Sequence, residues 1–439
     1  MAMRPLRRAD HGSWRRLNRP RHRHLRNEPT PPWQTPTRPS ACAARHWGND
    51  TVRLDRTCLP ADFAHGAFAA RVMTAEGPCV IGIIGGAAFD MTPRVGTMAH
   101  WMEAVSPAAC IRTRGVPMAL DLDALFANSA HDARDPAKPW LLAPIDLQAV
   151  KAAGVTYVRS MLERVIEERC RGDASRAEAV RAEVRAIIGD DLANLVPGSA
   201  EAMKVKAALV EKGWWSQYLE VGIGADAEIF TKCPPMAAVG TGAKVGVHPK
   251  SEWSNPEPEA VMVVNSRGTI QGATLGNDVN LRDVEGRSAL LLGRAKDNNA
   301  SAALGPMIRL FDDGFSLEDV RHAEITLTIS GRDGFALEER GAVGAISRDP
   351  TEIVGQMIGA HHQYPDGAVL YLGTPFSPSK DRGAAGMGFT HREGDVVRVA
   401  SPRLGALVNE VDRTDECPPW VFGTGALFAS LTRRGLPRP

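Results

Sequence analysis

The sequence lacks the closely spaced cysteines that mark zinc-binding and disulfide-stabilised proteins. Its seven cysteines lie far apart, with no CxxC pair and no histidine at the spacing of a zinc site. This pattern is typical of a reduced protein, so we expect a cytoplasmic location. The seven are Cys42, Cys58, Cys79, Cys110, Cys170, Cys233 and Cys417.

An excess of charge and a long apolar run are missing as well. The formal net charge is +1, whereas binding to phosphate backbones needs clustered positive charge. The longest apolar run, residues 79–89, is broken by glycines and falls short of the roughly 20 residues that a membrane helix requires. These absences argue against nucleic-acid and membrane partners and favour a small-molecule ligand.

The first fifty residues differ in composition from the rest. They are rich in arginine and proline and almost free of aliphatic residues, so they cannot bury enough apolar surface to offset their ordering entropy. We expect residues 1–50 to be a disordered, dispensable extension. A basic nucleic-acid arm and an organellar targeting peptide stay open as alternatives.

The remaining chain, with 44% hydrophobic and 23% charged residues overall, is long enough for more than one packed unit. We expect a small α+β domain at 54–142, a helical connecting segment at 143–215 and a mostly β catalytic domain at 216–439. Asp146 is predicted to cap a helix from Leu147, and helical spacing predicts helices at 97–105, 155–169, 174–188 and 350–362. Alternating or β-branched runs predict strands at 80–84, 260–264, 269–273, 324–330 and 396–400.

Glu257 and Glu259 alternate with prolines just before a predicted strand. Residues two apart in an extended chain point to the same side, so both carboxylates face one place. Their repulsion is unfavourable unless a cation or protons lie between them. Such oxygen ligands suit Mg²⁺, Mn²⁺ or Ca²⁺ better than zinc. The pair alone also fits a solvated edge strand.

The context of this pair resembles the magnesium-binding core of the fumarylacetoacetate hydrolase superfamily. The motifs that carry the resemblance come in family order. They are Glu257 and Glu259, Asn277-Asp278-Val279, Arg282-Asp283, Lys296, Leu304-Gly305-Pro306 and Gly373-Thr374-Pro375. The resemblance implies a mixed β-roll, a homodimer or higher homo-oligomer, and a Mg²⁺ site, with Mn²⁺ as a possible substitute. It also implies that Glu257, Glu259 and Asp278 are the metal ligands.

Family members that cleave carbon–carbon bonds resemble one another at a signature NYxxHxxE, whose His and Glu activate water. The matching piece here runs from Thr156 to Glu163, and Ser160 stands where the histidine belongs. Serine has no basicity near neutral pH, so hydrolysis is disfavoured. Glu163 keeps the spacing that would direct it to the same site.

Further motifs resemble a branch of dehydratases that act on 2-keto-3-deoxy acids derived from arabonate or xylonate. They are 143–148, 230–235, His248-Pro249, 286–288 and 296–299. The implied reaction removes a C3 proton and the C4 hydroxyl, and the enol rearranges to 2,5-dioxopentanoate, with Mg²⁺ as Lewis acid.

The resemblance also implies roles for side chains around the metal. Lys296 and Glu163 are the candidate acid and base, with Ser160 beside them. Thr374, Lys232 and Arg282 are the candidate substrate-binding residues, although Arg282 also fits a structural ion pair. A Mg²⁺-dependent acylpyruvate-type hydrolase or decarboxylase is the first alternative. A non-catalytic binding protein of the same fold is the second.

Overall fold

The computed structural model describes residues 52–437, except 172, 178, 183–194, 212, 214, 379 and 384–387. The predicted disordered extension lies outside the described residues. Gly48–Pro439 forms one compact unit, and its division at residues 143 and 216 stays a prediction. Among the described residues, no helix combines the length and apolar character needed to cross a bilayer.

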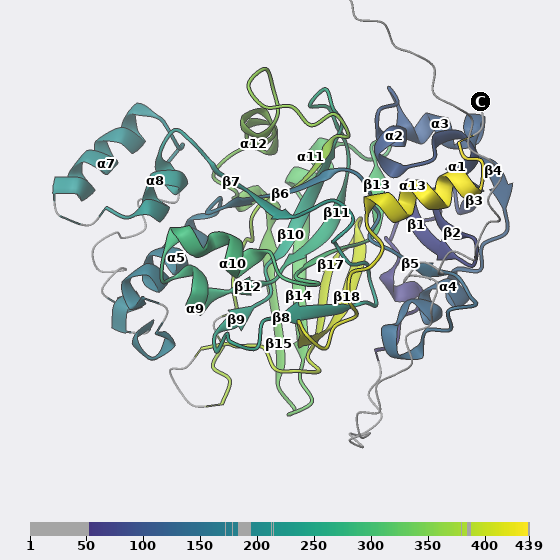
Figure 1. Cartoon of the computed structure of the whole chain (residues 1–439). Helices are drawn as coiled ribbons and strands as arrows, with labels where there is room; N and C mark the ends of the chain where they lie inside the picture. The colour runs from purple at the N-terminus through teal and green to yellow at the C-terminus, as the bar shows by residue number, and fades with distance from the viewer. Residues whose placement is uncertain are drawn as a thin grey trace, which may run out of the picture. The chain divides into compact units, whose positions relative to one another are not determined.

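One large and one smaller β-sheet form the body of this unit (Figure 1). The large sheet has 11 strands in the order β4-β3-β2-β1-β13-β11-β10-β16-β6-β7, with β5 beside β1. The smaller sheet has five strands in the order β15-β14-β17-β18-β8, and β12 pairs with β9 alone. Most neighbouring strands are antiparallel, whereas β16–β6 and β18–β8 are parallel. This arrangement confirms the predicted α+β class with a mixed β-roll.

The strands have the following bounds. They are β1 (Ala67–Thr74), β2 (Gly77–Ile84), β3 (Ala87–Asp90), β4 (Val116–Met118), β5 (Trp140–Leu141), β6 (Ala149–Gly154), β7 (Glu228–Cys233), β8 (Lys244–Val247), β9 (Ser254–Asn255), β10 (Pro258–Val264), β11 (Ile270–Asp278), β12 (Asn280–Leu281), β13 (Ala302–Leu310), β14 (Glu324–Ser330), β15 (Ala336–Ala342), β16 (Ala368–Tyr371), β17 (Val396–Ser401) and β18 (Gly405–Arg413).

The helices cover the sheets and their ends. They are α1 (Thr92–Val95), α2 (Met98–Met102), α3 (Pro107–Arg114), α4 (Leu122–Ser129), α5 (Val158–Cys170), α7 (Ala200–Glu211), α8 (Gln217–Ile223), α9 (Arg282–Glu285), α10 (Leu292–Lys296), α11 (Leu317–Arg321), α12 (Pro350–Met357) and α13 (Thr424–Arg433). In Figure 1, α7 and α8 lie at the opposite end of the molecule from β1–β4.

Strand β10 is buried on both faces, which explains its uninterrupted apolar sequence. Met262 packs with Leu327 and Val399 of the smaller sheet, between the two sheets. Val263, on the other face, packs in a second cluster that includes Trp101 of α2. The β10–β11 hairpin is therefore held from both sides, which gives its polar end a rigid support.

The turn of this hairpin fixes the pairing of its two strands. Asn265 Oδ1 accepts hydrogen bonds from the backbone N–H groups of Arg267 and Thr269, each at 3.0 Å. Gly268 has φ +79°, a conformation that glycine adopts without steric cost. The resulting register places Glu259 opposite Gly276 and Pro258 opposite Asn277.

Two helix predictions need correction. The prediction of a helix from Leu147 was wrong, because the chain enters β6 there. Asp146 instead accepts hydrogen bonds from the backbone N–H groups of Met98 and Ala99 at 2.6 and 2.9 Å. It therefore caps the distant helix α2. The helix predicted at 350–362 ends at Met357, because Ile358 turns extended and is buried. Of the helix predicted at 174–188, the structure describes residues 174–177 and 179–182, which are helical and begin with a 3-10 turn at Ala174–Arg176; the rest lies outside the described residues.

Candidate functional site

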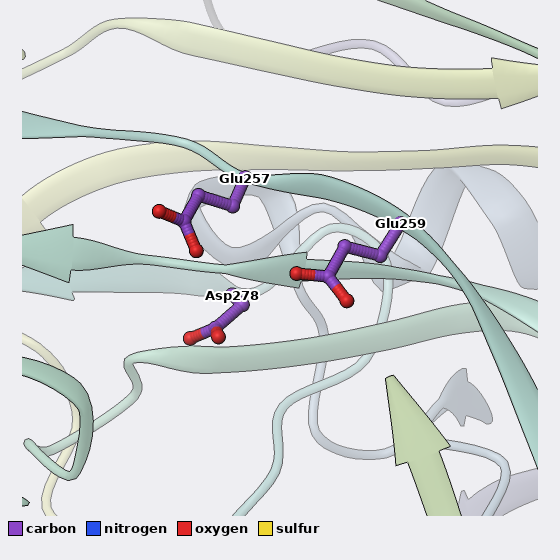
Figure 2. Close-up of side chains that lie close together, drawn as sticks. All are labelled: Glu257, Glu259 and Asp278. Carbon is purple, nitrogen blue, oxygen red and sulfur yellow. The ribbon is translucent and has the colours of Figure 1, made fainter. Parts of the chain in front are cut away.

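The carboxylates of Glu257, Glu259 and Asp278 converge at the polar end of the β10–β11 hairpin. Glu257 and Glu259 project from one side of the extended chain, and the backbone N–H of Asp278 donates to the carbonyl of Glu257 at 3.0 Å. One oxygen from each carboxylate lies within 4.8 Å of the others, and all three residues are at most 3% exposed. Figure 2 shows the three side chains directed toward one another. The structure thus brings together the three predicted ligands.

Three buried cations surround this carboxylate triad. Lys296 Nζ lies 2.5 Å from Glu257 Oε2 and 3.1 Å from Asp278 Oδ2. Lys232 Nζ forms an ion pair with Asp278 Oδ1 at 2.7 Å, and Arg164 of α5 bonds Glu257 Oε1. Burial alone would lower the pKa of Lys296, but Asp278 and Glu257 outweigh it and raise this pKa. The two carboxylates therefore favour the protonated form of Lys296.

Among the described residues, no cation forms an ion pair with Glu259. Its Oε2 accepts the backbone N–H of Gly373 at 2.7 Å. Burial, together with the charges of Asp278 and Glu257, raises its pKa well above the ordinary range. Gly373 has φ +94°, and a Cβ there would lie 2.0 Å from Thr156 Oγ1, so only glycine lets this N–H approach Glu259.

The charge balance around the triad fits a divalent cation. The cavity and the ion pairs linked to its walls contain seven carboxylates and five cations among the described residues, which leaves two negative charges when all twelve groups are ionised. The carboxylates are those of Glu163, Glu167, Glu228, Glu257, Glu259, Asp278 and Glu285, and the cations are Arg164, Arg181, Lys232, Arg282 and Lys296. Three oxygen ligands with this deficit suit Mg²⁺ or Mn²⁺.

The predicted catalytic residues take different places. Lys296 lines the cavity beside the triad. This cavity contains about 280 Å³ of empty space, counted out to its mouth. Glu163 does not line it; its carboxylate lies 3.0 Å from Arg181 and 3.3 Å from Arg282. Ser160 belongs to α5, but its side chain lies outside the described residues.

The predicted substrate-binding residues also separate. Thr374 lines the cavity, although its hydroxyl donates to the carbonyl of Phe376 at 2.6 Å. Lys232 is fully buried behind Asp278, where it also bonds the carbonyls of Val279 and Lys296. Arg282 bonds Glu167 at 2.6 Å and stacks on Trp253. Only Thr374 of these three faces the cavity, and their roles in substrate binding stay predictions.

Three cavity residues escaped the sequence interpretation: Arg164, Glu228 and Glu285. Arg164 directly follows Glu163, and one residue along a helix turns the side chain by about 100°, which brings Arg164 rather than Glu163 to the triad. Glu228 lies on β7, and Gly154 leaves room for it, because a Cβ there would lie 1.9 Å from Glu228 Oε2. Burial and the charge of Glu285 raise the pKa of Glu228 to about 7.

The free energy of unfolding should depend on pH because folding raises the pKa of Glu259. A carboxyl whose pKa is raised by folding binds more protons in the folded state than in the unfolded state. The free energy of unfolding therefore falls as the pH rises above the pKa that this carboxyl has in the unfolded chain. In EDTA, Glu259→Gln should therefore gain stability relative to the wild type as pH rises from about 5 to 8. Urea unfolding of both proteins measures this difference, and a constant difference across the range would contradict it.

Residues 225–412 match the family model described as Fumarylacetoacetate (FAA) hydrolase C-terminal. The matched segment runs from before β7 nearly to the end of β18 and contains the whole carboxylate triad.

Two curated relatives match a shorter part of the chain. One is 2-dehydro-3-deoxy-D-arabinonate dehydratase of Saccharolobus solfataricus, 32% identical over 186 residues, which are 42% of this chain and 59% of the relative. The other is a probable 2-keto-3-deoxyxylonate dehydratase of Haloferax volcanii, 33% identical over 195 residues, which are 44% of this chain and 63% of the relative. The match thus spans about three fifths of the length of each relative.

Solved structures share the fold over most of the chain. A hexagonal crystal form of 2-keto-3-deoxyarabinonate dehydratase aligns with a TM-score of 0.56 and 21% identity, covering 79% of this chain and 99% of that one. The same enzyme complexed with magnesium and 2,5-dioxopentanoate aligns with a TM-score of 0.55 and 20% identity, with the same coverage. At this identity the likeness establishes the fold alone.

Proposed function

We propose that residues 225–412, which match the family model described as Fumarylacetoacetate (FAA) hydrolase C-terminal, form a catalytic domain of that family and work as a Mg²⁺-dependent dehydratase. Its substrate is a 2-keto-3-deoxypentonate derived from arabonate or xylonate, and its product is 2,5-dioxopentanoate. The names of both curated relatives support this choice.

The observation that carries the proposal is the buried carboxylate triad with Lys296 at its edge. The ionisable groups in and around the cavity leave two negative charges uncompensated when all are ionised, and a divalent cation at the triad would balance them. The serine at position 160, in place of the histidine of the hydrolase signature, favours loss of water over its addition.

Glu257, Glu259 and Asp278 would hold the metal, which supplies Lewis-acid polarisation of a 2-keto acid when bound. Lys296 keeps its proton and presents a positive charge to the anionic substrate oxygens. Lys232 and Arg164 hold Asp278 and Glu257 in place from behind. These buried contacts orient the ligands before substrate arrives.

Glu228 is the best-placed acid–base group for the proton transfers. A pKa of about 7 leaves part of it ionised at neutral pH, ready to accept the C3 proton. The protonated Glu228 then returns this proton to the departing C4 hydroxyl, which leaves as water. The C3=C4 unsaturated keto acid that remains then loses a proton from C5 and gains one at C3, and the C4=C5 enol so formed tautomerises to the dioxo acid. Glu228 thus replaces Glu163 as our candidate base.

Glu228→Gln should lower kcat by about 10²–10⁴-fold, the usual contribution of a general base, and change the Mg²⁺ affinity little. The acidic limb of the pH–rate profile, where activity falls as a group with a pKa near 7 becomes protonated, should disappear in this variant. Glu163→Gln is the matched control, because it changes a carboxyl paired with Arg181 and Arg282 outside the cavity. Loss of activity in Glu163→Gln but not in Glu228→Gln would reverse the assignment.

A product assay tests the reaction itself. The purified protein, loaded with Mg²⁺, is incubated with 2-keto-3-deoxyxylonate or 2-keto-3-deoxyarabinonate. We expect a semialdehyde that an NAD(P)-linked dehydrogenase oxidises, and no activity in EDTA. Release of pyruvate from acylpyruvates without any semialdehyde would establish the hydrolase alternative instead. Mg²⁺ binding without turnover of either substrate class would favour a binding protein.

We also propose that the chain works as a homodimer or higher homo-oligomer in the cytoplasm. The family resemblance supports the assembly. The cysteines of the described part of the chain are all free, which fits a reducing compartment. Light scattering of the purified protein tests the oligomeric state.

A further inference from the structure

A second and larger cavity lies apart from the carboxylate site. It encloses about 1080 Å³ of empty space, counted out to its mouth, and shares no lining residue with the first cavity. Its walls come from β5, the loop at 236–243, residues 299–300 and the C-terminal loop at 418–422. The proposed dehydratase reaction makes no use of it.

Most of the wall is apolar, and its mouth is aromatic. Trp140 and Leu141 contribute from β5, while Trp420 and Val421 remain 48% and 62% exposed at the C-terminal loop. Among the described residues no aspartate or glutamate lines the cavity, whereas Arg71, His131, Arg134 and Lys244 do. The cavity therefore combines apolar surface with positive charge only.

Most of this positive charge is already compensated by neighbouring groups. Arg71 donates to the carbonyls of Ala143 and Ile145 and lies 3.7 Å from Asp146. Lys244 pairs with Asp412 at 2.8 Å. Burial lowers the pKa of His131, which keeps it neutral near pH 7.

Arg134 is the exception. Its Nη2 donates to the carbonyl of Ser129 at 2.7 Å, and its guanidinium lies 5.2 Å from the centre of the Trp140 ring. Its Nε is buried without a hydrogen-bond acceptor, and no carboxylate of the described residues pairs with it. A half-buried guanidinium without a carboxylate partner favours a ligand that supplies the negative charge.

We propose that this cavity binds an amphipathic anion, a carboxylate with an apolar chain or ring, whose head group pairs with Arg134. The apolar body then lies against Trp140 and Leu141, and the C-terminal loop covers it. The arginine-rich residues 1–50 are unsuited to this place because their charge repels that of Arg134. Planar guanidinium donors match a carboxylate in geometry as well as charge.

Calorimetric titration with octanoate and with 1-octanol separates the anionic head from the apolar chain. The wild type should bind octanoate about tenfold or more tightly than octanol, as expected of a charge-assisted hydrogen bond. Arg134→Met should remove this preference. The matched control Arg114→Met changes an exposed arginine at the end of α3 and should keep it. Equal binding of both compounds by the wild type would overturn the proposal.

Two further variants locate the site. Val421→Glu adds a negative charge at the exposed mouth, where folding is unaffected, and should weaken octanoate binding. Glu259→Gln, at the metal site, should leave octanoate binding intact. If it abolished this binding, the anion would bind at the carboxylate triad and the proposal would fail, while the proposed reaction would stand. A change of oligomer mass in Arg134→Met, with octanoate binding unchanged, would instead make this surface an interface between copies.

Discussion

Glu259→Gln is expected to lower the turnover of the Mg²⁺-loaded protein by about a thousandfold while the protein stays folded. A metal acting as Lewis acid contributes several kcal/mol to the transition state, and each 1.36 kcal/mol corresponds to a factor of about ten. Within the described part of the chain, Glu259 is the ligand whose removal leaves no buried cation unpaired, since its hydrogen-bond donor is the backbone N–H of Gly373. The amide oxygen of glutamine can still accept that hydrogen bond.

Two measurements distinguish a lost ligand from a damaged fold. The wild type should gain about 2.7 kcal/mol of unfolding free energy at a Mg²⁺ concentration of a hundred times its Kd, whereas Glu259→Gln should gain little. Without metal, the variant should be as stable as the wild type or more stable by about 0.5–2 kcal/mol. Glu252→Gln, an exposed neighbour on the same segment, is the matched control. A fully active Glu259→Gln protein would remove the triad from the mechanism.

The convergence of the three carboxylates follows from short-range rules, although Asp278 was predicted as a ligand from the family resemblance. Glu257 and Glu259 share a side through the period of two in an extended chain, and the turn at Asn265 brings Asp278 back beside them. Each step spans few residues and depends on backbone geometry. The convergence seen in Figure 2 follows from them with little tertiary information.

The acid–base group was less predictable because its position depends on long-range packing. Glu163 and Arg164 are neighbours in sequence, and only the rotation of α5 against β10 decides which of them reaches Glu257. Glu228 joins the site because β7 pairs with β6 at the edge of the large sheet, far along the chain from the triad motifs. The prediction that Asp146 caps a helix from Leu147 was wrong for the same reason. The helix that Asp146 caps begins 48 residues earlier, at Met98.

Lys296→Met should reduce the unfolding free energy of the metal-free protein by about 3–5 kcal/mol, the usual loss when one partner of a buried ion pair is removed. Lys296 is 2% exposed and compensates both Glu257 and Asp278, so the variant leaves carboxylates buried with less positive charge. Urea unfolding in EDTA measures the loss. The exposed Lys250→Met is the matched control and should change stability by less than about 0.5 kcal/mol.

The double variant Lys296→Met with Glu257→Gln separates charge compensation from packing. If the loss arises from uncompensated carboxylate charge, neutralising Glu257 restores part of the stability, and the two changes are non-additive by about 0.5–3 kcal/mol. Mg²⁺ should likewise recover part of the stability of the single variant, because a divalent cation replaces the missing positive charge. Strictly additive losses, unaffected by Mg²⁺, would mean that Lys296 fills space rather than balances the triad. The lysine and the metal would then no longer share the electrostatic role on which the proposed reaction depends.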